Sequence, residues 1–161
     1  MKTWLATCGI IAPLVIILPA AAMSPTEVAK IAKSVTVAIK TPEDRGSGAI
    51  IARSGNTYTV LTAAHVVKKT DRQYTIELGD GKKYSIRGRQ LSTTGNLDLA
   101  IVKFQSNRTY PVVKIGDSNS AVEGSLAYVA GFPLATAAIT QSVYTFSDGK
   151  ITANSSQPFD N

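Results

Sequence analysis

The stretch that decides the fold reads Ala49-Ile50-Ile51-Ala52-Arg53-Ser54-Gly55-Asn56-Thr57-Tyr58-Thr59-Val60-Leu61. It contains two apolar or alternating runs, Ala49–Ala52 and Thr57–Leu61, separated by the turn residues Ser54-Gly55-Asn56. Strand-forming runs on both sides of a short turn that contains Gly and Asn are typical of an antiparallel β-hairpin. The stretch therefore predicts two neighbouring strands.

Outward from this hairpin, the same pattern of short strands and tight turns continues along the chain. Further strands are predicted at Val35–Ile39, Tyr74–Leu78, Tyr84–Arg89, Leu99–Phe104, Leu126–Ala130, Thr140–Phe146 and near Ile151. Two more hairpin loops are predicted at Gly79-Asp80-Gly81 and Ser147-Asp148-Gly149. Regular short strands with such turns favour an all-β antiparallel sandwich or barrel. The first six strands suffice for a closed barrel, whereas about three remain after residue 120.

A short helix is predicted ahead of the strands. Ser24 and Glu27 form a Ser-x-x-Glu capping box, and Pro25 suits the first helical position. An apolar face at helical spacing then follows, made of Val28, Ile31, Ala32 and Val35. We expect this face to lie against a core, although a partner-binding segment is the alternative.

Residues 1–22 have the pattern of a secretory signal peptide. Lys2 precedes an almost wholly apolar stretch, and Ala20-Ala21-Ala22 offers a small-residue cleavage site before Met23. An uncleaved membrane anchor is the alternative, but a span needs about 20 apolar residues and two prolines interrupt this stretch. We therefore expect cleavage, and no stable membrane insertion afterwards.

Cleavage would remove Cys8, the sole cysteine. An exported chain without a disulfide must be stabilised by its core, which favours a bacterial periplasmic or secreted protein. The formal net charge is +6, but the basic residues are scattered in ones and twos, as at Lys68-Lys69 and Lys82-Lys83. A nucleic-acid site would instead show a clustered basic stripe, so we expect no nucleic-acid partner.

Two motifs carry candidate chemistry. The only histidine, His65, lies in Thr62-Ala63-Ala64-His65-Val66-Val67, and Asp98 lies in Asn96-Leu97-Asp98-Leu99-Ala100-Ile101-Val102. Each residue alone has a structural explanation: a lone histidine beside valines is usually a hydrogen-bonded core residue, and an aspartate before a strand usually caps a turn. Imidazole is nevertheless well suited to removing a proton from a serine hydroxyl, which is a weak nucleophile without an adjacent base.

The two motifs, in this order within an all-β pattern, resemble those of trypsin-like serine peptidases of the bacterial exported, Deg-like type. Further matches are Arg45-Gly46-Ser47-Gly48-Ala49-Ile50-Ile51, Ala130-Gly131-Phe132-Pro133 and Ile139-Thr140-Gln141-Ser142-Val143. The resemblance covers roughly residues 26–152. It implies His65 as the general base and Asp98 as the carboxylate that orients it. It also implies a polypeptide substrate and no cofactor, and a lone histidine makes a zinc or other metal site improbable.

The resemblance further implies an antiparallel double β-barrel of the chymotrypsin-like type. We expect the peptidase domain to span residues 23–161, with a complete first barrel at about 34–118 and an incomplete second barrel at about 119–161. An incomplete barrel leaves open strand edges, which favours self-association.

The serine nucleophile of the family, in Gly-x-Ser-Gly-Gly, has no counterpart in these 161 residues. Ser155 and Ser156 lack the flanking glycines that let a backbone present the hydroxyl and the oxyanion-binding amides. By the family pattern the nucleophile would fall beyond Asn161, so the chain as it stands is expected to be inactive. The alternative is a catalytically inactive exported module that binds peptides, or the remnant of a truncated protease gene.

Overall fold

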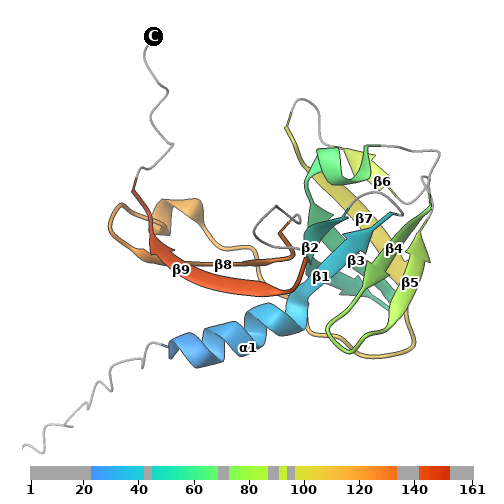
Figure 1. Cartoon of the computed structure of the whole chain (residues 1–161), viewed down its shortest axis with the longest axis horizontal. Coiled ribbons are helices and arrows are strands. Elements are labelled where there is room, and N and C mark those ends of the chain that lie inside the picture. The colour runs from blue at the N-terminus through green and yellow to red at the C-terminus, as the bar shows by residue number, and fades with distance from the viewer. Residues whose placement is uncertain are drawn as a thin grey trace, which may run out of the picture.

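The computed structural model describes residues 23–41, 45–68, 73–86, 91–93, 97–133 and 142–152. The predicted signal peptide at 1–22 lies outside these residues, as do Ser155 and Ser156. The helices and strands of the described residues form a barrel and a separate hairpin, and one helix lies beside the hairpin (Figure 1).

The barrel is a seven-stranded antiparallel sheet in the order β5-β4-β1-β2-β3-β7-β6. In chain order its strands are β1 (Thr36–Lys40), β2 (Arg45–Ser54), β3 (Thr57–Thr62), β4 (Tyr74–Glu77), β5 (Lys83–Ile86), β6 (Leu91–Thr93) and β7 (Ala100–Gln105). The two edge strands, β5 and β6, follow one another in the chain, so together they act as one interrupted strand. The result is a nearly closed six-strand antiparallel barrel, which confirms the expected all-β, chymotrypsin-like fold class.

The predicted hairpin at its centre is confirmed. β2 pairs with β3 from Gly48↔Thr62 to Ser54↔Thr57, and the turn between them contains Gly55 with φ 57°. A positive φ is readily adopted by glycine because glycine has no Cβ, so Gly55 permits the tight turn. Along β3 the side chains alternate between half-buried and buried positions, with Tyr58, Val60 and Thr62 turned inward.

The core fills the barrel. Its fully buried side chains are Val37, Ile39, Ile50, Tyr58, Val60, Tyr74, Ile76, Ile86, Val102 and Phe104. At one end the core becomes aromatic, because the Phe104 ring lies 5.1 Å from that of Tyr58 and 4.9 Å from that of Tyr84. The hydroxyl of Tyr84 is hydrogen-bonded to those of Ser106 and Tyr110, both at 2.8 Å. Burial and the bond to Tyr84 raise the pKa of Tyr110 above its usual range.

The hairpin consists of β8 (Leu126–Gly131) and β9 (Thr145–Lys150), preceded by a 3₁₀ turn, η3 (Ser118–Ser120). Two predictions for this region were wrong in part. Residues 140 and 141 of the strand predicted at Thr140–Phe146 lie outside the described residues, and within the described part the strand begins at Thr145. The predicted loop Ser147-Asp148-Gly149 lies inside β9. These three residues pair in register with Val129, Tyr128 and Ala127 of β8. β9 is exposed along most of its length, so polar side chains on this strand lose little contact with water. The apolar strand β8 therefore determines the pairing, although the sequence of β9 itself resembles a loop.

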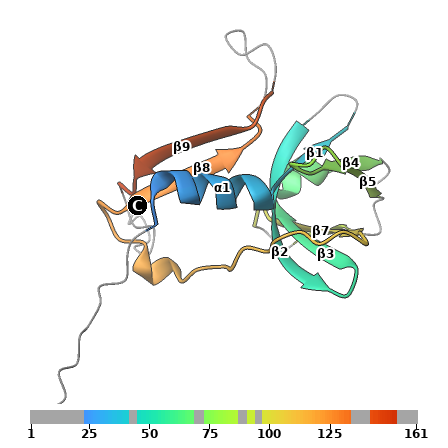
Figure 2. The ribbon, with the colours of Figure 1, turned by 90° about the horizontal axis from the view of Figure 1, so that it is seen from below.

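Helix α1 (Pro25–Val35) begins with the predicted capping box. Ser24 Oγ accepts from the Glu27 backbone amide, and the Glu27 carboxylate accepts from the Ser24 amide. Its inner face buries Val35, whereas Ile31, predicted to lie on that face, is 47% exposed. Seen from below, α1 runs along the β8–β9 hairpin (Figure 2), and Lys33 Nζ lies 5.9 Å from the centre of the Tyr144 ring. In the part of the chain that the structure describes, no helix is both long enough and apolar enough to span a membrane.

One ion pair links two barrel strands and makes stability depend on pH. Lys40 Nζ of β1 lies 2.6 Å from Glu77 Oε2 of β4, and Lys83 Nζ lies 3.7 Å from the same oxygen. The hydrogen bond from Lys40 lowers the pKa of Glu77 below its ordinary value of 4.5. The Glu77 carboxylate therefore binds a proton more readily in the unfolded chain than in the folded chain. The contribution of Glu77 to the free energy of unfolding is complete above its unfolded-state pKa of 4.5. It is lost as the pH falls through the lower pKa of Glu77 in the folded chain.

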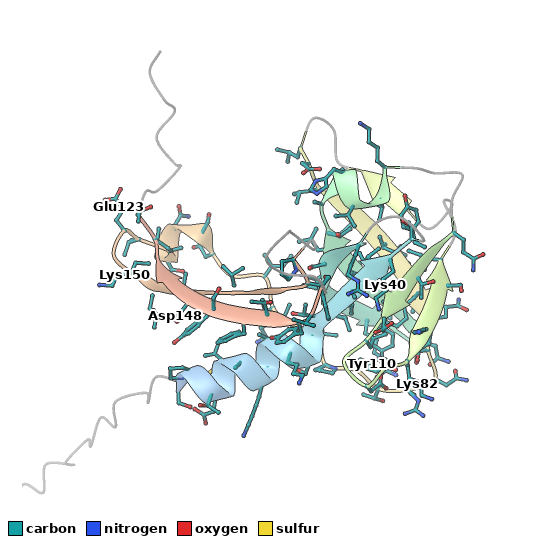
Figure 3. All side chains as sticks on the ribbon, viewed as in Figure 1. Lys40, Lys82, Tyr110, Glu123, Asp148 and Lys150 are labelled. Carbon is teal, nitrogen blue, oxygen red and sulfur yellow. The ribbon has the colours of Figure 1, made fainter. Side chains whose placement is uncertain are left out.

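We expect Glu77→Gln to lower the free energy of unfolding by about 0.5–1 kcal/mol near neutral pH, because the pair is only partly exposed. The difference from the wild type should shrink toward zero at a pH below the folded-state pKa of Glu77, where both chains carry a neutral side chain. Urea denaturation at the two pH values measures this. Glu123→Gln, at an exposed site on the hairpin side of the molecule (Figure 3), is the matched control. A difference of equal size at both pH values would contradict the assignment.

Candidate active site

His65 is positioned by the end of a central barrel strand. β3 ends at Thr62, and the chain then enters a 3₁₀ turn, η1 (Ala64–Val67), in which the Val66 amide donates to the Ala63 carbonyl at 3.2 Å. The small side chains of Ala63 and Ala64 let this turn form directly at the strand end. His65 therefore stands at the rim of the barrel rather than in its core, and the explanation of a buried core histidine is wrong.

Asp98 reaches the same rim because β7 is the antiparallel neighbour of β3. Their register pairs Thr62 with Ala100, so the end of β3 lies beside the start of β7. Asp98 lies two residues before Ala100, and His65 lies three residues after Thr62. The sheet register thus brings together two residues that are far apart in the sequence.

The carboxylate of Asp98 binds His65 at two points. His65 Nδ1 lies 2.6 Å from Asp98 Oδ2, and the His65 backbone amide donates to Asp98 Oδ1 at 2.9 Å. The hydrogen bond from the imidazole, followed by that from the backbone amide, lowers the pKa of Asp98. With Asp98 ionised, Nδ1 carries the proton, and Nε2 is the ring nitrogen that remains to accept one from another group.

Both side chains are accessible: that of His65 is 70% exposed and that of Asp98 is 60% exposed. An oriented, accessible imidazole of this kind can act as a general base and then as a general acid. Among the described residues, no three His, Cys, Asp or Glu side chains gather in a way that could hold a metal ion.

Gly46 supports the turn that carries His65, although the sequence pattern indicated only that it belongs to a strand. A Cβ placed on Gly46 would lie 2.5 and 2.6 Å from the two γ-carbons of Val66, the residue that follows His65. Real Cβ atoms do not approach this closely, so the turn that carries His65 can sit where it does because residue 46 is glycine. A second glycine, Gly48, packs in the same way against Val60 of β3.

We expect Gly46→Ala to lower the free energy of unfolding by about 1–3 kcal/mol, because Val66 is β-branched and cannot swing aside easily. It should also shift or broaden the downfield proton resonance of the His65 Nδ1–H group. Denaturant unfolding and proton NMR measure the two effects. Gly149→Ala is the matched control, since a Cβ there meets nothing within 4 Å. An unchanged unfolding midpoint and resonance in Gly46→Ala would refute this role.

Ser47 is a second residue whose contacts the sequence did not predict. Its carbonyl accepts from Thr62 Oγ1 at 2.7 Å, and its Oγ accepts from the Phe132 backbone amide at 2.7 Å. Arg45, two residues earlier, donates from its guanidinium to the Ser142 carbonyl. The one signal in the sequence was the small-residue run Gly46-Ser47-Gly48, which permits close approach of other backbone.

Comparison with known proteins identifies the family. The family model for the trypsin-like peptidase domain matches residues 46–161. The chain belongs to the trypsin-like peptidase family. The match begins at the glycine that supports the His65 turn, and it includes both His65 and Asp98.

Several relatives of this peptidase domain are known in Staphylococcus aureus. HtrA-like serine proteases from strains USA300, NCTC 8325 / PS 47 and bovine RF122 / ET3-1 are each 37% identical to it over 93 residues. The aligned stretch covers 57% of this chain and 12% of each relative. The chain thus spans a small part of these proteases and is of serine-type peptidase lineage.

Proposed function

We propose that this chain contributes two members of the catalytic triad of a serine endopeptidase, His65 as the general base and Asp98 as the residue that orients it. The observation that carries the proposal is the two-point bond of the Asp98 carboxylate to the ring and backbone of His65. A carboxylate in this position fixes the imidazole tautomer and stabilises the imidazolium that forms during the reaction.

In this mechanism a serine hydroxyl attacks the carbonyl carbon of the scissile peptide bond while Nε2 of His65 takes its proton. His65 then gives that proton to the leaving amine, and the acyl-enzyme forms. Water then attacks the acyl group while Nε2 of His65 takes its proton, and the protonated His65 returns that proton to the serine oxygen as the acyl group leaves as a carboxylic acid. The substrate class is therefore polypeptide, and the groups named need no cofactor. We place the serine outside these 161 residues, because none of their serines stands in a Gly-x-Ser-Gly-Gly segment.

The sequence of residues 1–22 supports export, so we propose a periplasmic or secreted peptidase domain that begins near Met23. We retain the division into a first barrel at about 34–118 and a partial second barrel at about 119–161 as part of the proposal.

The deciding experiment is made on the polypeptide that carries this sequence in its own host, called the host polypeptide below. Its intact mass is measured, and it is treated with a fluorophosphonate, which labels activated serines. A mass several kilodaltons above that of residues 23–161, together with one labelled serine, would support the endopeptidase. A mass equal to that of residues 23–161 without labelling would overturn it.

The second candidate is a catalytically inactive exported module that binds peptides by strand addition. It is favoured by the β8–β9 hairpin, whose two strands pair only with each other among the described residues. An unpaired strand edge can bind an extended peptide through backbone hydrogen bonds. Peptide binding by a host polypeptide that no fluorophosphonate labels would favour this candidate.

The same hairpin predicts self-association of residues 23–161. Leu126 and Val129 of β8 are 56% and 69% exposed, and Val143, two residues before β9, is 55% exposed. Among the described residues β8 and β9 pair only with each other, so their outer edges are open. We expect the weight-average sedimentation coefficient in sedimentation velocity to rise with concentration, and Val129→Lys to reduce the rise, since charge on an edge strand opposes pairing. Val112→Lys, on an exposed valine outside the hairpin, should not reduce it. A concentration-independent monomer would refute the prediction.

A further inference from the structure

The barrel and the β8–β9 hairpin meet along β2, at a joint that includes two hydrogen bonds made by side chains of β2. The Arg45 guanidinium donates to the carbonyl of Ser142, just before β9. The Phe132 amide, just after β8, donates to Ser47 Oγ at 2.7 Å. The Val113 amide, in the segment that leads from β7 toward the hairpin, donates to the Ile50 carbonyl at 2.9 Å, farther along β2. The bond to Ser47 depends on a hydroxyl group, so a substitution can remove it without altering the backbone and while leaving the Arg45 bond in place.

The fit at Ser47 is tight on one side and open on the other. A Cβ on Gly131 would lie 2.9 Å from Ser47 Oγ and 3.4 Å from Ser47 Cβ, so β8 approaches this closely because residue 131 is glycine. Beside the joint lies a pocket of about 390 Å³ that Ser47 shares with Val129, Pro133 and Thr145. The bond is therefore formed at close range, while room remains next to the Ser47 side chain.

Ser47 is also tied to the turn that carries His65. Its carbonyl accepts from Thr62 Oγ1, in the last residue of β3, at 2.7 Å. The preceding residue, Gly46, packs against Val66 of η1. One residue thus contacts the hairpin through its side chain and the approach to His65 through its backbone.

We propose that Ser47 is a positioning residue, which fixes the β8–β9 hairpin at a set distance and angle from His65. The inference rests on the proposed function in one respect, namely that His65 acts in catalysis. A hairpin held in this way stays in one place relative to His65 while a peptide binds and leaves. Without the Ser47 hydroxyl, the Phe132 amide loses its acceptor and the hairpin moves more freely about β2.

The first test is hydrogen exchange of the Phe132 amide in the host polypeptide, followed by mass spectrometry with residue-level fragmentation. Ser47→Ala should speed this exchange about tenfold, the factor that corresponds to one lost hydrogen bond. Ser47→Thr keeps the hydroxyl, and the neighbouring pocket has room for its methyl group, so exchange should stay within about threefold of wild type. Ser85→Ala, which removes an exposed serine of β5, is the matched control.

The second test measures position directly. Spin labels at Lys82→Cys in the barrel and Lys150→Cys in the hairpin (Figure 3), in a Cys8→Ser background, report the distance between the two parts. The distance distribution should be narrow in the wild type and in Ser47→Thr, and broader in Ser47→Ala. A change in stability alone would not broaden it, because labels in the folded molecules would keep their separation.

Gly131→Ala adds a test of the contact from its other side. Its Cβ would press on Ser47 Oγ, so this substitution should broaden the distance distribution when Ser47 is present and add little in the Ser47→Ala background. Unchanged Phe132 exchange in Ser47→Ala, or equal broadening in Ser47→Thr and Ser47→Ala, would overturn the inference.

The downfield proton resonance of His65 separates this inference from the proposed function. It should persist in every Ser47 variant, because the bond between His65 and Asp98 does not involve Ser47. Its absence from the wild type would count against the proposed function. In that case the exchange rate of the Phe132 amide and the spin-label distances would still decide whether Ser47 holds the hairpin.

Discussion

His65→Ala is expected to slow fluorophosphonate labelling of the host polypeptide by at least about 10⁴-fold. A serine hydroxyl attacks phosphorus only as its proton leaves, and within the described residues no second histidine can take that proton. The imidazole is oriented by Asp98 through a bond of 2.6 Å, so water that enters the emptied site cannot reproduce its orientation or its basicity.

The control for this prediction must leave the rim of the barrel otherwise unchanged. Lys68→Ala removes an exposed side chain just after η1 and should label at the wild-type rate. Circular dichroism of His65→Ala should match the wild type, because His65 is accessible and not part of the core. Labelling of His65→Ala at a rate near that of the wild type would remove His65 from the mechanism.

Phe104→Ala is expected to lower the free energy of unfolding by about 3–5 kcal/mol. The Phe104 side chain is 1% exposed and packs between the rings of Tyr58 and Tyr84. Its removal leaves a cavity that these rings cannot fill, because Tyr84 is tied to Tyr110 and Tyr58 donates to the Arg108 carbonyl at 2.9 Å. Urea denaturation of the host polypeptide, followed by tyrosine fluorescence, measures the loss.

Lys103→Ala is the matched control, since Lys103 precedes Phe104 on β7 and points outward into solvent. It should change the free energy of unfolding by less than about 0.5 kcal/mol. A loss in Phe104→Ala no larger than in Lys103→Ala would mean that the aromatic end of the barrel is not packed as described.

Local chemistry explains which features the sequence predicted. The turn at Gly55 and the capping box at Ser24 depend on residues within a few positions of one another, so their patterns can be recognised without a fold. His65 and Asp98 were predicted as a pair through the resemblance to a family. The geometry that joins them, the Thr62↔Ala100 register, is a property of the assembled sheet.

The features that the sequence did not predict depend on distant contacts. Ser147 to Gly149 look like a loop until β8 lies beside them, because an exposed strand accepts polar residues when its partner sets the pairing. Ile31 and Val35 were predicted on the same apolar face of α1, but only Val35, at the end next to the barrel, is buried, whereas Ile31 is exposed. The role of Ser47 depends on Phe132, and no local pattern links two residues so far apart.

The two-point hold of Asp98 on His65 also limits which side chains can occupy position 98. Both oxygens of the carboxylate serve as acceptors, one for the ring and one for the main chain. Asparagine offers one acceptor, which can still bind the His65 amide, and a donor, which the ring can meet only as the tautomer that carries its proton on Nε2. Glutamate has the chemistry but adds a methylene, which moves both oxygens away from a turn that the backbone holds in place. We therefore expect asparagine at position 98 to cost the ring its proton-accepting Nε2, and glutamate to displace the bonds that hold the ring and its turn.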